Sequence, residues 1–323
     1  NGPFHVSKWT EKTSVKLVKN NEYNGESSVS PSSVTFYINN NDSEVADKMN
    51  SVTYDVAFLS SSQFSSIENK KDLNSVAVQN VTYSFIFNQN DNNYRNKNMR
   101  LAFCRSCDTS SLFDSQSDIS KADGIVPPSC KIGGEDYRNG NAAELLSYDE
   151  TLAKKNFNDA LLELGSSSGG TTILCTEQYE SFVKQMVQKL QKTLGVKFVS
   201  TVKVVSESDL EAAVNDGNYS VAFYPFKAKS SFAGEIIEGF DQNNIFGYES
   251  DVLSQKIRNI KNNSGSLEGE RSAVADAENY LVSEAVIMPV FYENSYFVTS
   301  KKTSGIYFYS SADNVCFINA KKS

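Results

Sequence analysis

Histidine is almost missing from this sequence, and long apolar runs are missing altogether. The 323 residues include one histidine, His5, which removes histidine-rich metal sites and argues against a Ser-His-Asp triad. His5 falls in a stretch that alternates like a strand, so we expect an ordinary strand side chain there. No apolar run approaches the roughly 20 residues that span a bilayer. The first residues also lack the charged-then-apolar pattern of a signal segment.

Basic residues are outnumbered by acidic ones. Lysine and arginine total 31 against 39 aspartates and glutamates, which gives a net charge of −8 and a pI near 5.0. Because phosphate groups bind basic surfaces, this charge argues against a nucleic-acid partner. The apolar fraction is only 39%, but 20 phenylalanines and 16 tyrosines supply large rings that can fill a core. The length allows one large domain or two of ordinary size.

Cysteine is also scarce. Five cysteines are too few for a disulfide-built scaffold of this length, and their number is odd. Cys104 and Cys107 form a C-x-x-C pair, which suggests either a redox site or zinc. A redox pair usually begins a helix, and structural zinc needs two more ligands at similar spacing. Neither condition is visible in the sequence, so we interpret the pair as two thiols one turn apart on a helix.

The beginning of the chain has the pattern of strands joined by turns. Residues 1–25 alternate as a β-hairpin does, and 34–38 predict a further strand. A longer alternation follows over 76–87, where we expect one strand with a bulge near Asn80.

The middle of the chain alternates between strand and helix patterns. Residues 149–164 predict an amphipathic helix that Gly165 ends. Such alternation implies an α/β fold in which helices cover a sheet with parallel strands. The predicted elements that follow are a strand at 172–175, a helix at 179–194, a strand at 196–205, a helix at 209–214 and a strand at 219–224.

The opening segment also has a specific order of residue types. Residues 2–9 are Gly-Pro-Phe-His-Val-Ser-Lys-Trp, and residues 15–23 are Val-Lys-Leu-Val-Lys-Asn-Asn-Glu-Tyr. This order resembles the G-P-[FY]-x-[VL]-x-x-W…[IV]-x-L-x-[KR]-N-x-x-Y segment of the extracytoplasmic solute-binding proteins of family 5. That family comprises the oligopeptide-, dipeptide- and nickel-binding proteins of ABC importers. There the segment lies well inside the chain, so we expect these residues to be the C-terminal portion of a longer protein.

Five further segments resemble the family and follow in its order. Residues 54–57 resemble its G-E-I-D-V-A strand, although the usual Ser-Gly-Glu before it is Ser-Val-Thr at 51–53. The resemblance fails between about Thr109 and Ala143. The other segments are Phe87-Asn88 with Arg100-Leu101-Ala102, 148–165, 190–195 and 277–293.

The resemblance implies a fold. It is an α/β, two-lobed type II periplasmic-binding-protein-like fold with mixed sheets, from which the N-terminal part of the first lobe is absent. Residues 1–95 would form part of the first lobe and be mainly β. Residues 96–290 would form the second α/β lobe, and 291–323 would return to the first.

The resemblance also implies a function. We expect a non-enzymatic protein that binds a peptide-like solute and delivers it to the membrane permease of an ABC importer. It would be extracytoplasmic, either periplasmic or a cell-surface lipoprotein, with its signal and anchor upstream of Asn1. We expect a monomer without cofactor or metal.

One segment indicates where the solute would bind. Residues 219–229 match a family strand that ends in G-W-x-x-D, with Phe226 in the place of the Trp and Lys229 in the place of the Asp. In the family that Asp pairs with the ligand's α-ammonium group, which a lysine would repel. The solute would therefore present a carboxylate, a carbonyl or no charge to Lys227 and Lys229. The alternative is that both lysines are solvated loop residues.

The wall of the binding cleft is harder to place. Peptide binders gain affinity mainly from backbone hydrogen bonds to an extended ligand, and these leave little trace in a sequence. Tyr224, Phe226 and the loop of Asn88 are the expected wall residues. Each could equally belong to the core or to the lobe surface.

Two rival functions fit parts of the sequence. Residues 181–184 match S-x-x-K, while 302–305 and 311–314 approximate the K-T-G and S-D-N motifs of penicillin-recognising enzymes. Both approximate motifs carry an inserted residue and follow in reversed order, so we reject an acyl-serine enzyme. The other rival is a surface interaction or sensory module that retains the binding-protein fold without transport.

Overall fold

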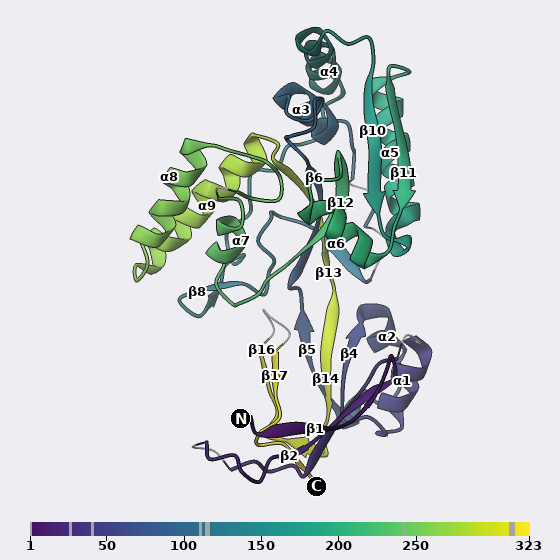
Figure 1. Ribbon diagram of the computed structural model, residues 1–323, viewed down its shortest axis with the longest axis vertical. Coiled ribbons are helices and arrows are strands. Elements are labelled where there is room, and N and C mark those ends of the chain that lie inside the picture. The colour runs from purple at the N-terminus through teal and green to yellow at the C-terminus, as the bar shows by residue number, and fades with distance from the viewer. Residues whose placement is uncertain are drawn as a thin grey trace. The chain divides into compact units, whose positions relative to one another are not determined.

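The computed structural model describes residues 2–25, 28–39, 42–109, 112–113, 117–241, 243–309 and 314–323. The chain divides into two compact units (Figure 1). Unit 1 contains Asn1–Gln79 and Asn294–Ser323, and unit 2 contains Asn80–Glu293. Among the described residues, no helix combines the length and the apolar character needed to cross a bilayer.

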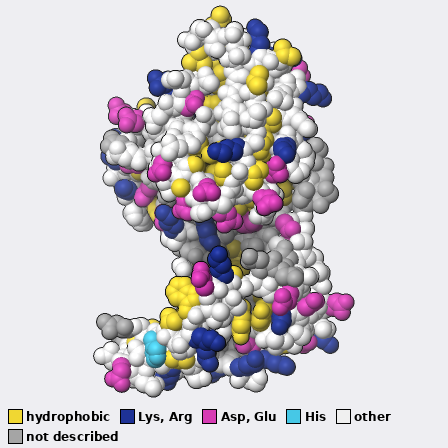
Figure 2. Space-filling view, turned by 45° about the vertical axis from the view of Figure 1, so that its right-hand side comes forward, with side chains coloured by type: hydrophobic (Ala, Val, Ile, Leu, Met, Phe, Trp, Pro, Cys, Tyr) yellow, Lys and Arg dark blue, Asp and Glu magenta, His cyan; other side chains and the backbone are white. Residues whose placement is uncertain are grey.

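The first sheet of unit 1 confirms the predicted N-terminal hairpin. It is an antiparallel meander of β1 (Phe4–Thr10), β2 (Ser14–Lys19) and β3 (Ser33–Tyr37). His5 lies on β1 and is exposed, as expected of an ordinary strand side chain, and it is the cyan group in Figure 2. On the face that Figure 2 shows, acidic and basic side chains are interspersed.

The second sheet of unit 1 joins distant parts of the chain. β14 (Ser295–Ser300) lies between β4 (Val56–Ser60) and β5 (Leu73–Val78) and is antiparallel to both. The helices α1 (Asp42–Asn50) and α2 (Ser61–Ser66) pack with this sheet around a small apolar core. The remaining elements of unit 1 are the 3₁₀ turn η1 (Lys70–Asp72) and two ladders, β15 (Thr303–Ser304) with β18 (Lys321–Lys322) and β16 (Tyr307–Tyr309) with β17 (Asn314–Cys316).

The core of unit 2 is a six-stranded sheet in the order β11-β10-β12-β6-β13-β7. β10 is parallel to β11 and β12, whereas β6 is antiparallel to β12 and β13. β7 is antiparallel to β13, so four strands run in one direction and two in the other. The strands are β6 (Val81–Phe87), β7 (Ile119–Lys121), β10 (Gly169–Cys175), β11 (Phe198–Val204), β12 (Val221–Lys227) and β13 (Ile287–Glu293). A short hairpin of β8 (Lys131–Ile132) and β9 (Glu135–Asp136) lies outside the sheet.

Helices cover both faces of this sheet, as the strand-helix alternation predicts (Figure 1). Side chains alternate along β12, so that Phe223 joins one apolar core and Ala222 joins the other. The helices on the Phe223 face are α3 (Lys97–Arg105), α4 (Glu150–Leu164) and α5 (Glu180–Leu194), which η2 (Glu177–Tyr179) precedes. The helices on the Ala222 face are α6 (Glu207–Asn215), α7 (Gly234–Glu238), α8 (Asp251–Asn262) and α9 (Leu267–Ser283).

Helix ends follow the capping residues of the sequence. The Asp149 side chain accepts a hydrogen bond from the Leu152 N–H at 2.9 Å and begins α4, and Gly165 ends it at φ 62°. Glycine adopts that left-handed conformation without steric cost. Ser206 begins α6 by accepting from the Asp209 N–H at 3.1 Å, and its hydroxyl also contacts the Asp209 carboxylate. Asp209 thus contacts the hydroxyl of the cap residue, whereas the full reciprocal capping box is formed at α2 by Ser60 and Gln63.

The alternation over 76–87 belongs to two strands, so the prediction of one bulged strand is wrong. β5 ends at Val78 in the unit 1 sheet, and β6 begins at Val81 in the unit 2 sheet. Gln79 and Asn80 carry the chain from one sheet to the other. Because β6 pairs over its whole length with β12, the units change at 79/80 rather than near residue 95. The return falls at 293/294, where the sequence places it near 290.

Polar contacts to Glu278 of α9 hold residues 125–138, where the sequence has little helix or strand periodicity. The buried Glu278 carboxylate accepts from the backbone N–H groups of Ile125 and Val126 at 2.7 and 2.9 Å. It also accepts from the Tyr137 hydroxyl at 3.1 Å and from the Arg138 guanidinium at 2.9 Å through Nη1, with a second contact through Nη2. This buried acid therefore replaces the hydrogen bonds that regular secondary structure would supply.

Candidate functional site

The sheet of unit 2 has a topological switch point. The chain passes from β10 through α5 to β11, and then through α6 to β12 on the other side of β10. Since α5 follows β10 on one face and α7 follows β12 on the other, the loops after β10 and β12 diverge. Ligands of open α/β sheets bind outside the carboxyl ends of the strands at such a point. We call the C-terminal ends of β10, β11, β12 and β13, with the residues that directly follow them, the carboxyl edge.

Two predicted wall residues lie on β12 and lead to this edge. Tyr224 and Phe226 share one face of the strand, and both are half-buried. The Phe226 ring lies 5.8 Å from the rings of Phe240 and Phe246, and 5.6 Å from the Tyr224 ring. Burial raises the pKa of Tyr224, and the Glu211 carboxylate adds to the shift. These two rings therefore belong in part to the core and keep part of their surface outside it.

The two predicted lysines end the same strand. Lys227 is the last residue of β12, Lys229 follows it, and both are exposed. The buried Ala228 between them donates its N–H to the Asn80 carbonyl at 3.1 Å, which fixes the segment beside the start of β6. Within the described part of the chain, the Lys229 ammonium has no hydrogen bond or ion pair. The structure thus brings Tyr224, Phe226, Lys227 and Lys229 to one strand end.

Asn88 lies at the other end of the sheet. It follows β6 at the end where Phe87 pairs with Val221, the first residue of β12. About 20 Å of extended strand separates it from Lys227. Its side-chain amide donates to the carbonyls of Gly217 and Tyr219 at 2.9 and 2.8 Å, and its oxygen accepts from the Asn90 N–H at 2.9 Å. The structure therefore does not bring Asn88 together with the other predicted residues, and its polar atoms already have partners.

Three further residues gather at the carboxyl edge. Tyr83, near the start of β6, pairs with Pro225 of β12, and its ring lies 4.4 Å from the ring of Tyr179, which follows β10. Glu293 is the last residue of β13. Burial raises the pKa of Tyr83 to about 12, and the Glu293 carboxylate adds to this shift. Burial also raises the pKa of Tyr179, followed by the effects of Tyr83 and Glu293. No motif marks these residues, since only the strand order brings them together.

The edge offers groups that can hold a polar ligand. Two ammonium groups and a carboxylate lie at this edge, with the Tyr83 and Tyr179 rings on one face of the sheet and the Tyr224 and Phe226 rings on the other. Ser181 and Lys184 of the S-x-x-K match lie on α5, where the Lys184 ammonium pairs with Glu180 at 2.7 Å. The approximate S-D-N motif at 311–314 lies outside the described residues except for its last position. In the described ranges, no three His, Cys, Asp or Glu side chains gather as a metal site.

Comparison with protein families identifies the family of this chain. The profile of the bacterial extracellular solute-binding proteins, family 5 Middle, matches residues 1–246. The chain belongs to this family. Among curated proteins, the dipeptide-binding protein DppE of Bacillus subtilis (strain 168) is 23% identical over 319 residues, which is 95% of this chain. The chain spans 57% of the length of that protein.

Solved structures of binding proteins share the fold of this chain. The chain superposes with a TM-score of 0.79 on the substrate-binding domain of an oligopeptide ABC transporter from Bacillus anthracis str. Ames, at 16% identity. It superposes with a TM-score of 0.77 on Listeria monocytogenes OppA bound to peptide, at 20% identity. Both superpositions cover 100% of this chain, and 65% and 64% of the other chains. The predicted mixed-sheet fold of the periplasmic binding proteins is confirmed.

Proposed function

We propose that this chain binds a peptide-like solute outside the cytoplasm and delivers it unaltered to the permease of an ABC importer. Family membership supports extracellular solute binding, and the relative DppE is named for binding dipeptides. The observation that carries the proposal is the carboxyl edge. There the switch point of the sheet coincides with two lysines and two half-buried rings on the end of β12.

The charges at this edge favour a solute that presents a carboxylate or carbonyl group to Lys229. The Lys229 ammonium is exposed, and no described residue neutralises it, so a ligand oxygen can replace its water. Tyr224 and Phe226 would supply apolar wall beside it. Lys227 would serve as a second donor at the same strand end. The role proposed for Asn88 is indirect, because its side chain holds the opposite end of β12 in place.

The other parts of the proposal follow from the family. The partners would be the solute and a membrane permease, and the protein would act as a monomer without cofactor, metal or catalysis. It would work in the periplasm or as a lipoprotein on the cell surface.

The test is ligand-dependent stability of the full-length protein. A ligand that binds only the folded state adds about 2.7 kcal/mol at a hundred times its Kd. We expect peptides with a free C-terminal carboxylate to raise the melting temperature, and C-terminally amidated versions to raise it less. The variant Lys229→Glu should weaken binding of the free-acid peptides by about 10- to 100-fold.

A matched control is available on the same sheet. Lys197→Glu makes the same charge change at an exposed position before β11, at the opposite edge, and should leave binding unchanged. Equal losses of peptide affinity in both variants would show a general charge effect and contradict the placement of the binding site at Lys229. If a broad panel of peptides and small solutes gives no stabilisation, the surface interaction or sensory module replaces solute transport.

A further inference from the structure

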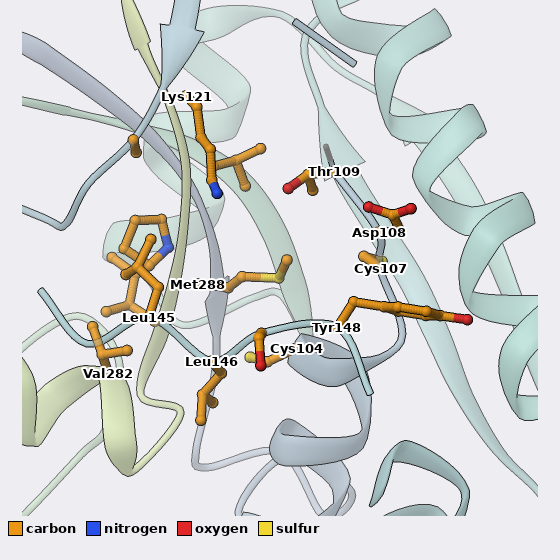
Figure 3. A pocket seen from close by; sticks show the side chains of 15 residues that line it. Cys104, Cys107, Asp108, Thr109, Lys121, Leu145, Leu146, Tyr148, Val282 and Met288 are labelled. Atoms are coloured by element: carbon orange, nitrogen blue, oxygen red, sulfur yellow. The ribbon is translucent and has the colours of Figure 1, made fainter. Parts of the chain in front are cut away.

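A cavity of about 200 Å³ lies in unit 2 on the side of β13 away from β6. Among the described residues, β7 pairs only with the last three residues of β13, so the first half of that strand has no strand partner on this side. Residues 145–148 lie opposite instead, and the end of α3 closes the cavity (Figure 3). The cavity therefore faces the start of β13, whereas the carboxyl edge lies at its end.

Most of the cavity wall is apolar. Leu145, Leu146 and Met288 are half-buried, and all three line the cavity. Cys104 and Cys107 extend the same wall. Burial raises the pKa of both thiols, which keeps them uncharged near neutral pH. Such a wall suits an aliphatic group.

Charged side chains lie on one side of the cavity. In Figure 3, Lys121, Thr109 and Asp108 lie along its upper side, whereas Leu145 and Val282 lie to the lower left. Lys121 is the last residue of β7, and Asp108 follows the end of α3. Both are exposed, so their charged groups lie at the mouth of the cavity. The cavity is therefore amphipathic, with charges of both signs beside an apolar wall.

Both charged groups can bind a further partner. Within the described part of the chain, the Lys121 ammonium has no hydrogen bond or ion pair. The Asp108 carboxylate has two oxygens with about four lone-pair sites, so it can bind an ammonium group in addition to a partner inside the chain. A ligand with one carboxylate and one ammonium group would satisfy both charges through charge-assisted hydrogen bonds. A ligand with only one of these groups would face a like charge at the mouth.

Hydrogen bonds hold the wall of the cavity in place. The Asp149 N–H donates to the Arg105 carbonyl at 3.0 Å, and the Glu144 N–H donates to the side-chain oxygen of Asn279 at 2.9 Å. Residues 145–148 are thus fixed at both ends. Small-molecule sites are usually formed in advance in this way, so little ordering entropy opposes binding.

The volume limits the size of the ligand. An apolar cavity of about 150 Å³ binds benzene. In proportion, a cavity of about 200 Å³ holds about eight heavy atoms. An aliphatic amino acid such as valine or leucine fits this volume when its charged groups lie at the mouth.

We propose that this cavity binds a free aliphatic α-amino acid. The Lys121 ammonium holds the carboxylate of the ligand, and the Asp108 carboxylate holds its α-ammonium group. The aliphatic side chain lies against Leu145, Leu146 and Met288. The site lies apart from the carboxyl edge, so this proposal does not depend on the proposed function.

The experiment is isothermal titration calorimetry of the full-length protein with L-leucine, for which we expect one saturable site in this cavity. Two analogues of leucine each lack one charge: 4-methylpentanoate lacks the ammonium group, and 3-methylbutylamine lacks the carboxylate. Each should bind about 10- to 100-fold more weakly than leucine. L-Tryptophan is too large for the cavity and should not displace leucine from it.

Two substitutions match the two analogues. Lys121→Gln should weaken leucine binding by about 10- to 100-fold and remove the preference for leucine over 3-methylbutylamine. Asp108→Asn should weaken it by a similar factor and remove the preference for leucine over 4-methylpentanoate. Because both positions are exposed, both variants should keep the melting temperature of the wild type.

The matched control is Lys203→Gln, which makes the same change at an exposed position on β11, at the opposite edge of the sheet. It should leave the leucine affinity unchanged. Lys229→Glu should also leave it unchanged, which separates this cavity from the carboxyl edge. The proposal is overturned if the wild-type protein binds no leucine, if Lys121→Gln and Lys203→Gln bind it equally well, or if Lys229→Glu removes the binding.

Discussion

The guanidinium of Arg138 faces the carboxylate of Glu278 through both of its terminal nitrogens, deep inside unit 2. The two side chains are 8% and 1% exposed. The same carboxylate accepts from two backbone N–H groups, so one acid stabilises a whole irregular segment. Breaking a buried pair by removing one partner leaves the other charge buried and alone.

The variant Glu278→Gln should therefore lower the free energy of unfolding by about 3–5 kcal/mol, measured by urea denaturation. Glu268→Gln makes the same change at an exposed position in the first turn of α9 and should change it by less than about 0.5 kcal/mol. The double variant R138M/E278L removes both charges and should recover part of the loss. Equal stability of Glu278→Gln and the wild type would contradict this account of the segment.

Asn88 should matter for stability and not directly for ligand contact. Asn88→Leu leaves the Gly217 and Tyr219 carbonyls without their donor and should cost about 3 kcal/mol. Asn92→Ala, at an exposed position in the same loop, serves as the control and should cost little. Peptide affinity measured well below the melting temperature should be the same in both variants. A large loss of peptide affinity in Asn88→Leu without loss of stability would show that Asn88 contacts the ligand directly.

Val52 is strained, and glycine should relieve the strain. Its φ of 53° follows the end of α1, in the left-handed region that β-branched residues avoid. In the family segment that residues 51–57 resemble, Ser-Gly-Glu stands where this chain has Ser-Val-Thr at 51–53, so a glycine takes the place of Val52. Val52→Gly should raise the free energy of unfolding by about 1 kcal/mol, seen as a higher melting temperature. Val45→Gly, at a half-buried position inside α1, should lower it by a similar amount.

Stability should fall in alkaline solution through the buried thiols. Burial raises the pKa of Cys130 to about 12 from an ordinary value of 9.0. Between these values the unfolded chain loses a proton that the folded protein keeps, so rising pH favours unfolding. Each such group contributes up to about 1.4 kcal/mol per pH unit. Urea denaturation between pH 9 and pH 10.5 should show a shallower decline in the free energy of unfolding for Cys130→Ala than for the wild type. An unchanged decline would contradict a contribution from Cys130.

Thiol accessibility should separate one cysteine from the other four. Cys316 is half-buried, whereas Cys104, Cys107, Cys130 and Cys175 are buried. Ellman's reagent at pH 8 should therefore modify one thiol quickly in the folded protein and the rest only after urea is added. Cys316→Ser should remove the fast phase. A fast phase that survives this change would show that unit 2 opens locally.

Helices and capped ends could be predicted from the sequence because their signals are local. The apolar spacing over 149–164 and the glycine at 165 lie within a few turns of one another. The segment at 125–138 gave no such signal, since its partner Glu278 comes about 140–150 residues later in the chain. The alternation over 76–87 was equally local, and nothing within it shows that its two halves join different sheets.

The same distinction between local signals and distant contacts applies to the candidate site. Tyr224, Phe226, Lys227 and Lys229 could be predicted together because they lie on one strand end. Tyr83, Tyr179 and Glu293 come from three different elements, and only the strand order brings them to the same edge. Asn88 is near Tyr83 in the sequence, but the length of β6 places it at the far end of the sheet.

The position of β14 has a consequence for how this protein is made. β14 lies between β4 and β5, although more than two hundred residues separate it from them in the chain. Until β14 has been synthesised, the backbone N–H and C=O groups of β4 and β5 that will pair with it are therefore unpaired. Other nascent chains can form hydrogen bonds with such strand edges and aggregate. Synthesis thus completes unit 1 last, and a chaperone that shields these edges would be most valuable before residue 295 emerges.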